Sequence, residues 1–298
     1  MPGLADLVAP YEFSPTVAVV CAGATALFVR GWLRLRRRGS APAAWRVLCF
    51  ITGVALIYAV LQTWLDYLSQ HMFWIHRAQH LVLHHLGPLL VLLALPGPVL
   101  RAGLPVRLRR PLAVLPLPRG PMRAICRSLQ HPILASVLFA GLVWYWLLPS
   151  VHFDAMLSIR QYKAMNWSMA VDGLLFWWLI VEPRRDAPGT PGYGTRVLML
   201  WFVMLPQIAI GAWLSLTPHA IYSVYNVCGR AWPIGPLTDQ QIGGLITWIP
   251  ASMMSMLGAL VVLRRWRAEA DPQTAATRPS RGDGRAPAMH PLSGTDKG

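Results

Sequence analysis

The residues best suited to chemistry in this chain are histidines gathered in one apolar stretch. Five of the nine histidines lie between residues 70 and 92, at positions 71, 76, 80, 84 and 85. Ionisable side chains are costly inside a membrane, so a function is the first explanation to consider. Residues four apart share a helix face, so His76, His80 and His84 are predicted to form a stripe about 80° wide. His71 is expected before this helix, and His85 on another face.

The stripe predicts a metal site, because imidazole is a common metal ligand. Imidazole suits copper, zinc, nickel and iron, whereas magnesium and calcium prefer cages of oxygen ligands. Met72, Met156 and Cys228 are expected on the same side of the membrane and would add soft ligands. Copper, especially Cu(I), is therefore the predicted metal. The sequence has no HExxH motif, so a zinc protease of that type is unsupported.

The composition predicts the elements that must position these histidines. Hydrophobic residues make up 55% of the chain, charged residues 13%, and 14 residues are tryptophan. We therefore expect an all-α, polytopic membrane helix bundle. Apolar runs of about 20 residues predict seven spans, at residues 14–33, 45–68, 73–95, 132–149, 164–182, 197–216 and 242–263. Residues 1–267 would form this membrane domain, and residues 268–298 a disordered cytoplasmic tail.

The distribution of charge predicts the orientation. The formal net charge is +15, and 23 of the 27 basic residues fall in loops and ends on one side of the predicted spans. The positive-inside rule then places the N-terminus outside and the C-terminus in the cytoplasm. Basic loops of this kind determine topology and touch anionic lipid. The partner they predict is the lipid bilayer, and no nucleic acid is expected.

This topology places most of the histidines in the outer half of the membrane. His76 and His80 are the predicted metal ligands, and His84, His152 and His219 are secondary candidates. An interfacial histidine satisfied by a carbonyl is the alternative for His219. Four carboxylates and two glycines are assigned supporting or structural roles: Asp66, Asp154, Asp172, Asp239, Gly243 and Gly244. Asp172 is also an alternative partner for His85.

Two other classes of function stay open. A metal or proton transporter would relay ions along the histidines, but the sequence LLVLLALP follows them, where polar residues should continue. A membrane redox protein carrying haem would need a second histidine at matching depth on another span. The interiors of spans one, two, five, six and seven contain none. Binding of copper is favoured over both.

Three blocks of residues resemble a known family. They are His76-x-x-Gln79-His80-Leu81-x-Leu83; Phe153-Asp154-Ala155-Met156-Leu157 with the later Gly173-Leu174-Leu175-Phe176-Trp177-Trp178; and Tyr222-x-x-Tyr225 with Asp239-Gln240-Gln241-Ile242-Gly243-Gly244. Over residues 60–262 the chain resembles the multi-pass bacterial CtaG-type assembly factors of caa-type cytochrome c oxidase.

The resemblance implies a protein of the bacterial plasma membrane that is not an enzyme. It would mature a haem-copper oxidase by supplying copper to the catalytic subunit, and a soluble copper donor is a further possible partner. The family's histidine pair corresponds to His76 and His80. Asp239 would orient a ligand or cap a helix, and Gly243 and Gly244 would allow a close helix approach.

The chain departs from the family pattern at three places. Arg77 stands where relatives commonly have methionine, Leu147 where they have histidine, and Asn166 where they have another histidine. His152 and His84 could replace the two missing ligands, or this branch could handle copper differently. Arg77 is expected to lower cation affinity unless it pairs with Asp66 or Asp154.

Overall fold

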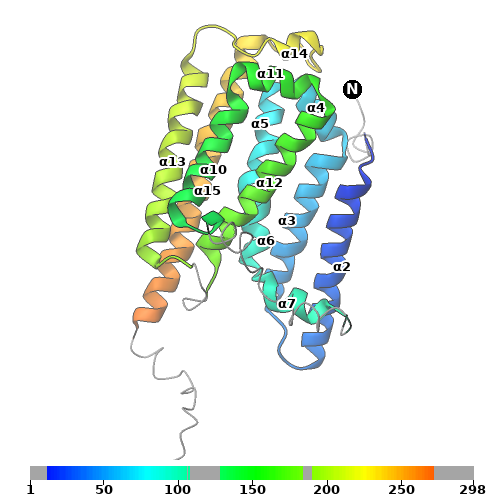
Figure 1. Ribbon diagram of the computed structural model, residues 1–298, viewed down its shortest axis with the longest axis vertical. Helices are drawn as coiled ribbons and strands as arrows, with labels where there is room; N and C mark the ends of the chain where they lie inside the picture. The colour runs from blue at the N-terminus through cyan, green and yellow to red at the C-terminus, as the bar shows by residue number, and fades with distance from the viewer. Residues whose placement is uncertain (1–11, 106, 108–127, 184–189, 272–298) are drawn as a thin grey trace, which may run out of the picture.

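The chain folds as a bundle of helices that run along one long axis (Figure 1). The computed structural model describes residues 12–105, 107, 128–183 and 190–271, and within these ranges the elements are all helices. The all-α prediction is confirmed for this part of the chain.

Five of the described helices are long and apolar enough to cross a membrane: α2 (Pro15–Arg37), α3 (Ala44–Gln62), α12 (Ile159–Val181), α13 (Tyr193–Leu216) and α15 (Pro236–Ala270). Two bent helix pairs raise the number to as many as seven if each pair is one span. The structure thus supports five to seven spans, and the orientation predicted from charge stays a prediction.

The bent pairs are interrupted where proline prevents the helix from continuing. The first pair joins α5 (Phe73–Leu81), a π-helix η1 (Val82–Leu86) and α6 (Gly87–Leu93) to α7 (Pro96–Gly103), across a bend of 72°. At this bend Leu95 has a left-handed backbone, with φ of 51°. The second pair joins α10 (Pro132–Leu147) to α11 (Pro149–Leu157) across a bend of 74°.

The predicted span 45–68 extends too far at its C-terminal end. The helix α3 ends at Gln62, and Thr63 is extended. The hydroxyl oxygen of Thr63 accepts a hydrogen bond from the backbone N–H of Leu65 at 3.3 Å. This N-cap starts a separate short helix, α4 (Trp64–His71). His71 ends α4, so it precedes α5 as expected.

The predicted boundary at residue 268 falls inside a helix, because α15 continues to Ala270. Residues 272–298, which carry the rest of the predicted disordered tail, lie outside the described residues.

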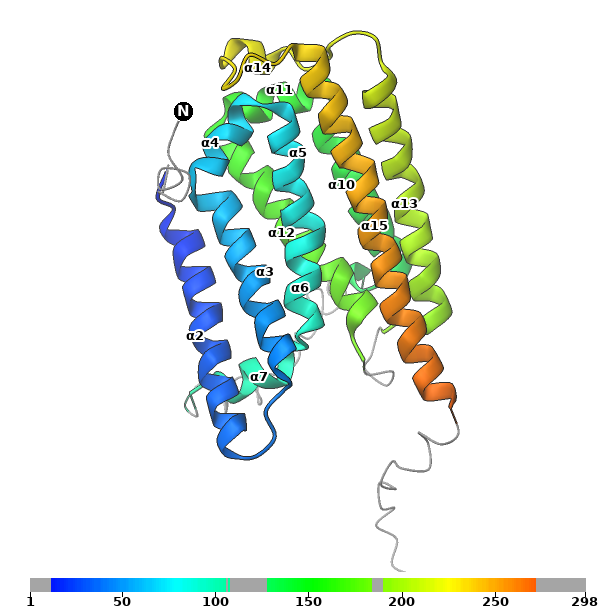
Figure 2. The same cartoon turned by 180° about the vertical axis from the view of Figure 1, so that it is seen from behind.

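The two ends of the bundle differ in their helices and in their charge. The short helices α4, α11 and α14 (Val224–Val227) gather at one end, and α7 lies at the other (Figures 1 and 2). Three arginines close α2 at the α7 end, at positions 34, 36 and 37, and Arg267 closes α15 there. This asymmetry agrees with the charge pattern expected of a membrane protein.

Apolar side chains fill the centre of the bundle and also cover its outside. Leu83, Phe139 and Trp177 are fully buried between the helices. Large side chains on the outer faces of α10, α13 and α15 are exposed, among them Trp144, Trp201, Phe202 and Leu260. An apolar surface of this extent is typical of helices that contact lipid.

Candidate functional site

The start of α5, which carries His76 and His80, is held by a carboxylate from α15. Asp239 accepts hydrogen bonds from the backbone N–H groups of Phe73 at 3.1 Å and Trp74 at 2.9 Å. It is fully buried, and Arg230 pairs with it at 2.6 Å. The first N–H groups of a helix have no partner within the helix, and an anion there is favourable. Asp239 therefore positions α5 and does not cap its own helix.

Two glycines of α15 allow α5 and α13 to approach it closely. A Cβ atom at Gly243 would lie 2.4 Å from Cδ1 of Phe73, and one at Gly244 would lie 2.5 Å from the hydroxyl oxygen of Ser215. Only glycine leaves this space open. The segment from Asp239 to Gly244 thus determines where α5 begins and how closely α5 packs against α15.

Three histidines meet near the α11 end of the bundle. The ring centroids of His76 and His80 are 4.3 Å apart, and those of His76 and His152 are 5.1 Å apart. All three side chains are buried, with exposed fractions of 0 to 1%. His76 and His80 come from α5, and His152 comes from α11, which the bend at Pro149 turns across the bundle. We call these three residues the histidine cluster.

Both ring nitrogens of His152 are engaged in hydrogen bonds. Nδ1 lies 3.0 Å from the carbonyl oxygen of Trp146, so Nδ1 carries the proton and donates. Nε2 lies 2.9 Å from the hydroxyl of Tyr225. Burial raises the pKa of Tyr225 well above its ordinary value, so the hydroxyl is protonated and donates to Nε2. The lone pair of His152 that could bind a metal is therefore occupied by Tyr225.

The nitrogens of His80 are engaged through longer contacts. Nη1 of Arg77 lies 3.4 Å from Nδ1, and Oδ1 of Asn166 lies 3.3 Å from Nε2. Because arginine only donates, Nδ1 is the acceptor and Nε2–H donates to Asn166. Contacts of this length are weak, so His80 can exchange its partners readily.

His76 differs from its neighbours because neither of its ring nitrogens has a hydrogen-bond partner among the described residues. Its side chain is completely buried. Buried polar groups are nearly always paired with protein or with ordered water, so each exception requires an explanation. In the same part of the chain, no group of three or more His, Cys, Asp or Glu side chains is arranged to hold a metal ion. The cluster thus offers one free ligand and two that must first give up a hydrogen bond.

Arg77 adds a buried positive charge beside this cluster. It is 4% exposed, and its Nε donates to the hydroxyl of Thr247 at 2.9 Å. The ion pairs found in the described ranges do not include Arg77. An ion pair with Asp66 or Asp154 could have offset the charge of Arg77, but neither is found in the described ranges. Asp154 is exposed, and Asp66 accepts a hydrogen bond from Tyr162.

His84 does not extend the stripe of His76 and His80. The π-helix at residues 82–86 has a wider turn than an α-helix, which changes the direction of the side chains that follow. Nε2 of His84 lies 2.9 Å from Oδ2 of Asp172, and its ring stacks on Phe139. The suggested pairing of His85 with Asp172 is wrong, because the histidine that contacts Asp172 is His84. No ring contact joins His84 to His80 within the described chain.

Asp66 is the acceptor of a buried network next to the cluster. Its Oδ1 accepts from the Tyr162 hydroxyl at 2.7 Å and from Nε2 of Gln79 at 2.8 Å. Burial raises the pKa of the Asp66 carboxyl to about 6. Gln79 lies between His76 and His80 on α5, so this network ties the helix to α4 and α12, in addition to the contact with Asp239 of α15.

His219 lies apart from the histidine cluster. Its side chain is exposed in the segment after α13, and its backbone carbonyl accepts from Nε2 of Gln240 at 3.2 Å. No ring contact links it to another histidine in the ranges that the structure covers. The exposed position agrees with the interfacial part of the alternative, whereas the carbonyl contact here belongs to the backbone of His219 and not to its side chain.

Several residues of the site carry no functional prediction from the sequence. Tyr225 and Tyr162 are not among the candidates, and Asn166 stands out only as a departure from the family pattern. The pattern Tyr222-x-x-Tyr225 is a signal that could have found one of them: Tyr222 donates to the Leu147 carbonyl at 2.8 Å and Tyr225 to His152.

The fold and the site together define a multi-pass helical membrane protein with buried histidines at one end of the bundle. Residues 26–269 match the profile of the cytochrome c oxidase caa3 assembly factors (Caa3_CtaG), and the chain belongs to this family. The resemblance inferred from the three sequence blocks is thereby confirmed.

Relatives of this chain occur in mycobacteria. An uncharacterized protein of Mycobacterium leprae is 28% identical over 267 residues, which cover 82% of this chain and 38% of the relative. Uncharacterized proteins of Mycobacterium bovis and Mycobacterium tuberculosis are each 25% identical over 283 residues, covering 89% of this chain and 40% of the relative. The chain thus spans about two fifths of the length of these relatives. No solved structure matches the chain.

Proposed function

We propose that this assembly factor carries copper for a haem-copper oxidase, with His76 as the first ligand and His152 and His80 as exchangeable ligands. The observation that supports this most directly is the pair of buried nitrogens on His76, which have no hydrogen-bond partner in the described chain. Two other imidazoles lie beside it, with ring centroids 4.3 and 5.1 Å away. Neutral imidazole is a suitable ligand for copper, and Cu(I) adds only one charge next to Arg77.

The hydrogen bonds of the cluster suit a carrier that must release its cargo. To bind copper, His152 must lose the Tyr225 hydroxyl from Nε2, and His80 must lose Arg77 from Nδ1. When copper leaves, both donors can return to the lone pairs they occupied. This competition weakens the binding of copper. It therefore favours transfer of copper to a site whose ligands are not engaged by other hydrogen-bond donors.

The proposed setting is the outer side of the bacterial plasma membrane. The arginines that close α2 and α15 lie at one end of the bundle, and the histidine cluster lies at the other. The positive-inside rule assigns the arginine end to the cytoplasm and therefore the end with the cluster to the outside. The partners would be the catalytic subunit of the oxidase and a soluble copper donor. The role is one of delivery and not of catalysis.

Copper binding can be tested with purified protein in detergent. Anaerobic titration with Cu(I) against a chromophoric chelator gives the stoichiometry and the affinity. We expect binding by the unaltered protein, and loss of it in the double variant His76→Ala/His80→Ala. His219→Ala is the matched control, because this exposed histidine lies apart from the cluster. Full stoichiometry in the double variant would falsify the site.

The delivery role requires a test in cells. Deletion of the gene should leave the oxidase polypeptides in the membrane but depleted of copper and inactive. Complementation with the His76→Ala/His80→Ala variant should fail, whereas complementation with His219→Ala should restore activity. Unchanged oxidase activity after deletion would exclude the assembly role in that host.

A further inference from the structure

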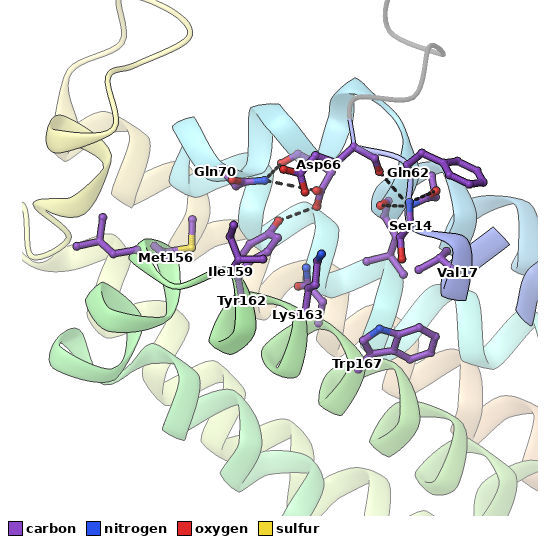
Figure 3. A pocket seen from close by; sticks show the side chains of 15 residues that line it. Ser14, Val17, Gln62, Asp66, Gln70, Met156, Ile159, Tyr162, Lys163 and Trp167 are labelled. Carbon is purple, nitrogen blue, oxygen red and sulfur yellow. Dashed lines mark hydrogen bonds between the residues drawn. The ribbon is translucent and has the colours of Figure 1, made fainter. Parts of the chain in front are cut away.

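A pocket next to the histidine cluster opens at the edge of the bundle (Figure 3). It lies between the start of α2, the end of α3, α4 and the α11–α12 junction, and its volume is about 110 Å³. The residues that matter for its chemistry are Asp66, Met156, Tyr162, Lys163 and Asn166. We call it the α2–α12 pocket.

The lining of the pocket suits a small, soft cation. Asp66 lines the pocket and is 8% exposed as a residue. Its Oδ1 accepts two short hydrogen bonds, whereas within the described chain Oδ2 accepts a long one, from Gln70 at 3.4 Å. Met156 adds a thioether, which is a ligand for Cu(I). The exposed Glu12 lines the same pocket, so two carboxylates face one exposed lysine, Lys163.

Only one layer of side chains separates this pocket from the histidine cluster. Asn166 lines the pocket, and its Oδ1 lies 3.3 Å from Nε2 of His80. Tyr162, one turn earlier on α12, also lines the pocket, and its ring centroid lies 6.3 Å from that of His76. The cluster itself is 0 to 1% exposed. A ligand that enters the pocket therefore has to displace the Asn166 side chain to meet the His80 ring. It binds this ring at Nδ1 once Arg77 has withdrawn, because Nε2 carries the proton.

We propose that the α2–α12 pocket is the route by which copper reaches the histidine cluster. This inference rests on the proposed function. Asp66 and Met156 make the first contacts with the ion, and rotation of the Asn166 amide away from His80 opens the inner wall. The long contact between Asn166 and His80 makes this rotation inexpensive. The step is a ligand exchange in which copper keeps its oxidation state.

The route can be tested by closing the pocket after the protein has folded. The protein is prepared with Cys21, Cys49, Cys126 and Cys228 replaced by alanine, and with Lys163→Cys as the labelling site. A bulky, membrane-impermeant thiol reagent then covers the pocket. Arg160→Cys is the matched control, because Arg160 is an exposed base three residues earlier on α12 and does not line the pocket.

The measurement is the rate of Cu(I) loading from a chelator, followed by the final stoichiometry. Labelled Lys163→Cys should load about tenfold more slowly or worse and reach the same final stoichiometry, whereas labelled Arg160→Cys should load at the unlabelled rate. Equal loading rates for the two labelled variants would overturn the route while leaving copper binding intact. Absence of copper from the unlabelled protein would overturn the proposed function and the route with it.

Discussion

The carboxylate of Asp239, on α15, accepts a hydrogen bond of 2.9 Å from the backbone N–H of Trp74, at the start of α5. This contact joins segments 165 residues apart and determines where the helix of His76 and His80 begins. It connects the most distinctive polar motif of α15 to the histidine cluster.

Replacement of Asp239 should therefore lower both stability and copper binding. Asp239→Ala removes the acceptor for two N–H groups and takes a carboxylate partner away from Arg230. We expect a loss of about 1–2 kcal/mol in the free energy of unfolding, read from thermal melting in detergent. Asp239→Asn keeps one acceptor and should lose less. Equal melting temperatures for the alanine variant and the unaltered protein would show that the cap does not hold α5.

Tyr225 is predicted to compete with copper for His152. Tyr225→Phe removes the hydroxyl that donates to Nε2 while keeping the ring in place. A neutral hydrogen bond contributes about 1 kcal/mol, so the Cu(I) affinity should rise about fivefold. Tyr222→Phe is the control, because the Tyr222 hydroxyl donates to the Leu147 carbonyl and not to a histidine. A fall in affinity specific to Tyr225→Phe would instead make the hydroxyl a supporting group of the metal site.

Arg77 is predicted to weaken cation binding through its charge. Its guanidinium touches His80 at 3.4 Å, and no carboxylate pairs with it in the described ranges. Arg77→Leu removes the charge without adding a metal ligand, so the Cu(I) affinity should rise about tenfold or more. Thr247→Val, which removes the other partner of Arg77 and leaves the charge, should not show this rise. If both variants bind copper with the original affinity, the charge of Arg77 does not act on the site.

Much of the helical framework could be predicted from the sequence, because hydropathy and proline positions determine it. The ranges around α12, α13 and α15 follow from apolar runs, and the approach of His76 to His80 follows from the spacing of an α-helix. For His152 the sequence predicts only a shared side of the membrane. The bend at Pro149 then brings it within 5.1 Å of His76.

Other features depend on contacts that leave no periodic signal. The π-helix at residues 82–86 separates His84 from the stripe, although the spacing of four residues is kept. The end of α3 depends on one extended residue, Thr63. Tyr225 meets His152 across 73 residues of sequence, through a short segment at the end of the bundle. These contacts follow from how the helix ends pack, which a single sequence does not reveal.

Gly243 is predicted to be essential for the approach of α5 to α15. In Gly243→Ala the added Cβ would lie 2.4 Å from the buried Phe73 ring, so α5 or the ring must move. Overpacking of this kind costs about 1–3 kcal/mol, which thermal melting would detect. Gly141→Ala in α10 is the control, because no described residue lies within 4 Å of its new Cβ. That variant should be neutral or stabilised by up to about 1 kcal/mol. Equal melting of the two variants would contradict the close approach.

Asp66 should make the protein less stable as the pH rises through the range from about 4 to 6. Burial raises the pKa of its carboxyl from 3.8 to about 6, against the opposing hydrogen bonds from Tyr162 and Gln79. Because the folded protein then binds more protons than the unfolded chain in this window, ionisation destabilises the folded state. The cost is complete about one pH unit above the folded pKa and amounts to about 3 kcal/mol at most.

The test compares the melting temperatures of the unaltered protein and of Asp66→Asn between pH 4 and pH 8. An asparagine side chain cannot ionise, so the variant should lack the contribution of this carboxyl. The difference between the two curves should change through the window from about 4 to 6 and become constant about one pH unit above this window. The direction is diagnostic: relative to the variant, the unaltered protein should gain stability on acidification. A relative loss on acidification would mean that Asp66 is stabilised as a carboxylate, and that its hydrogen bonds outweigh its burial.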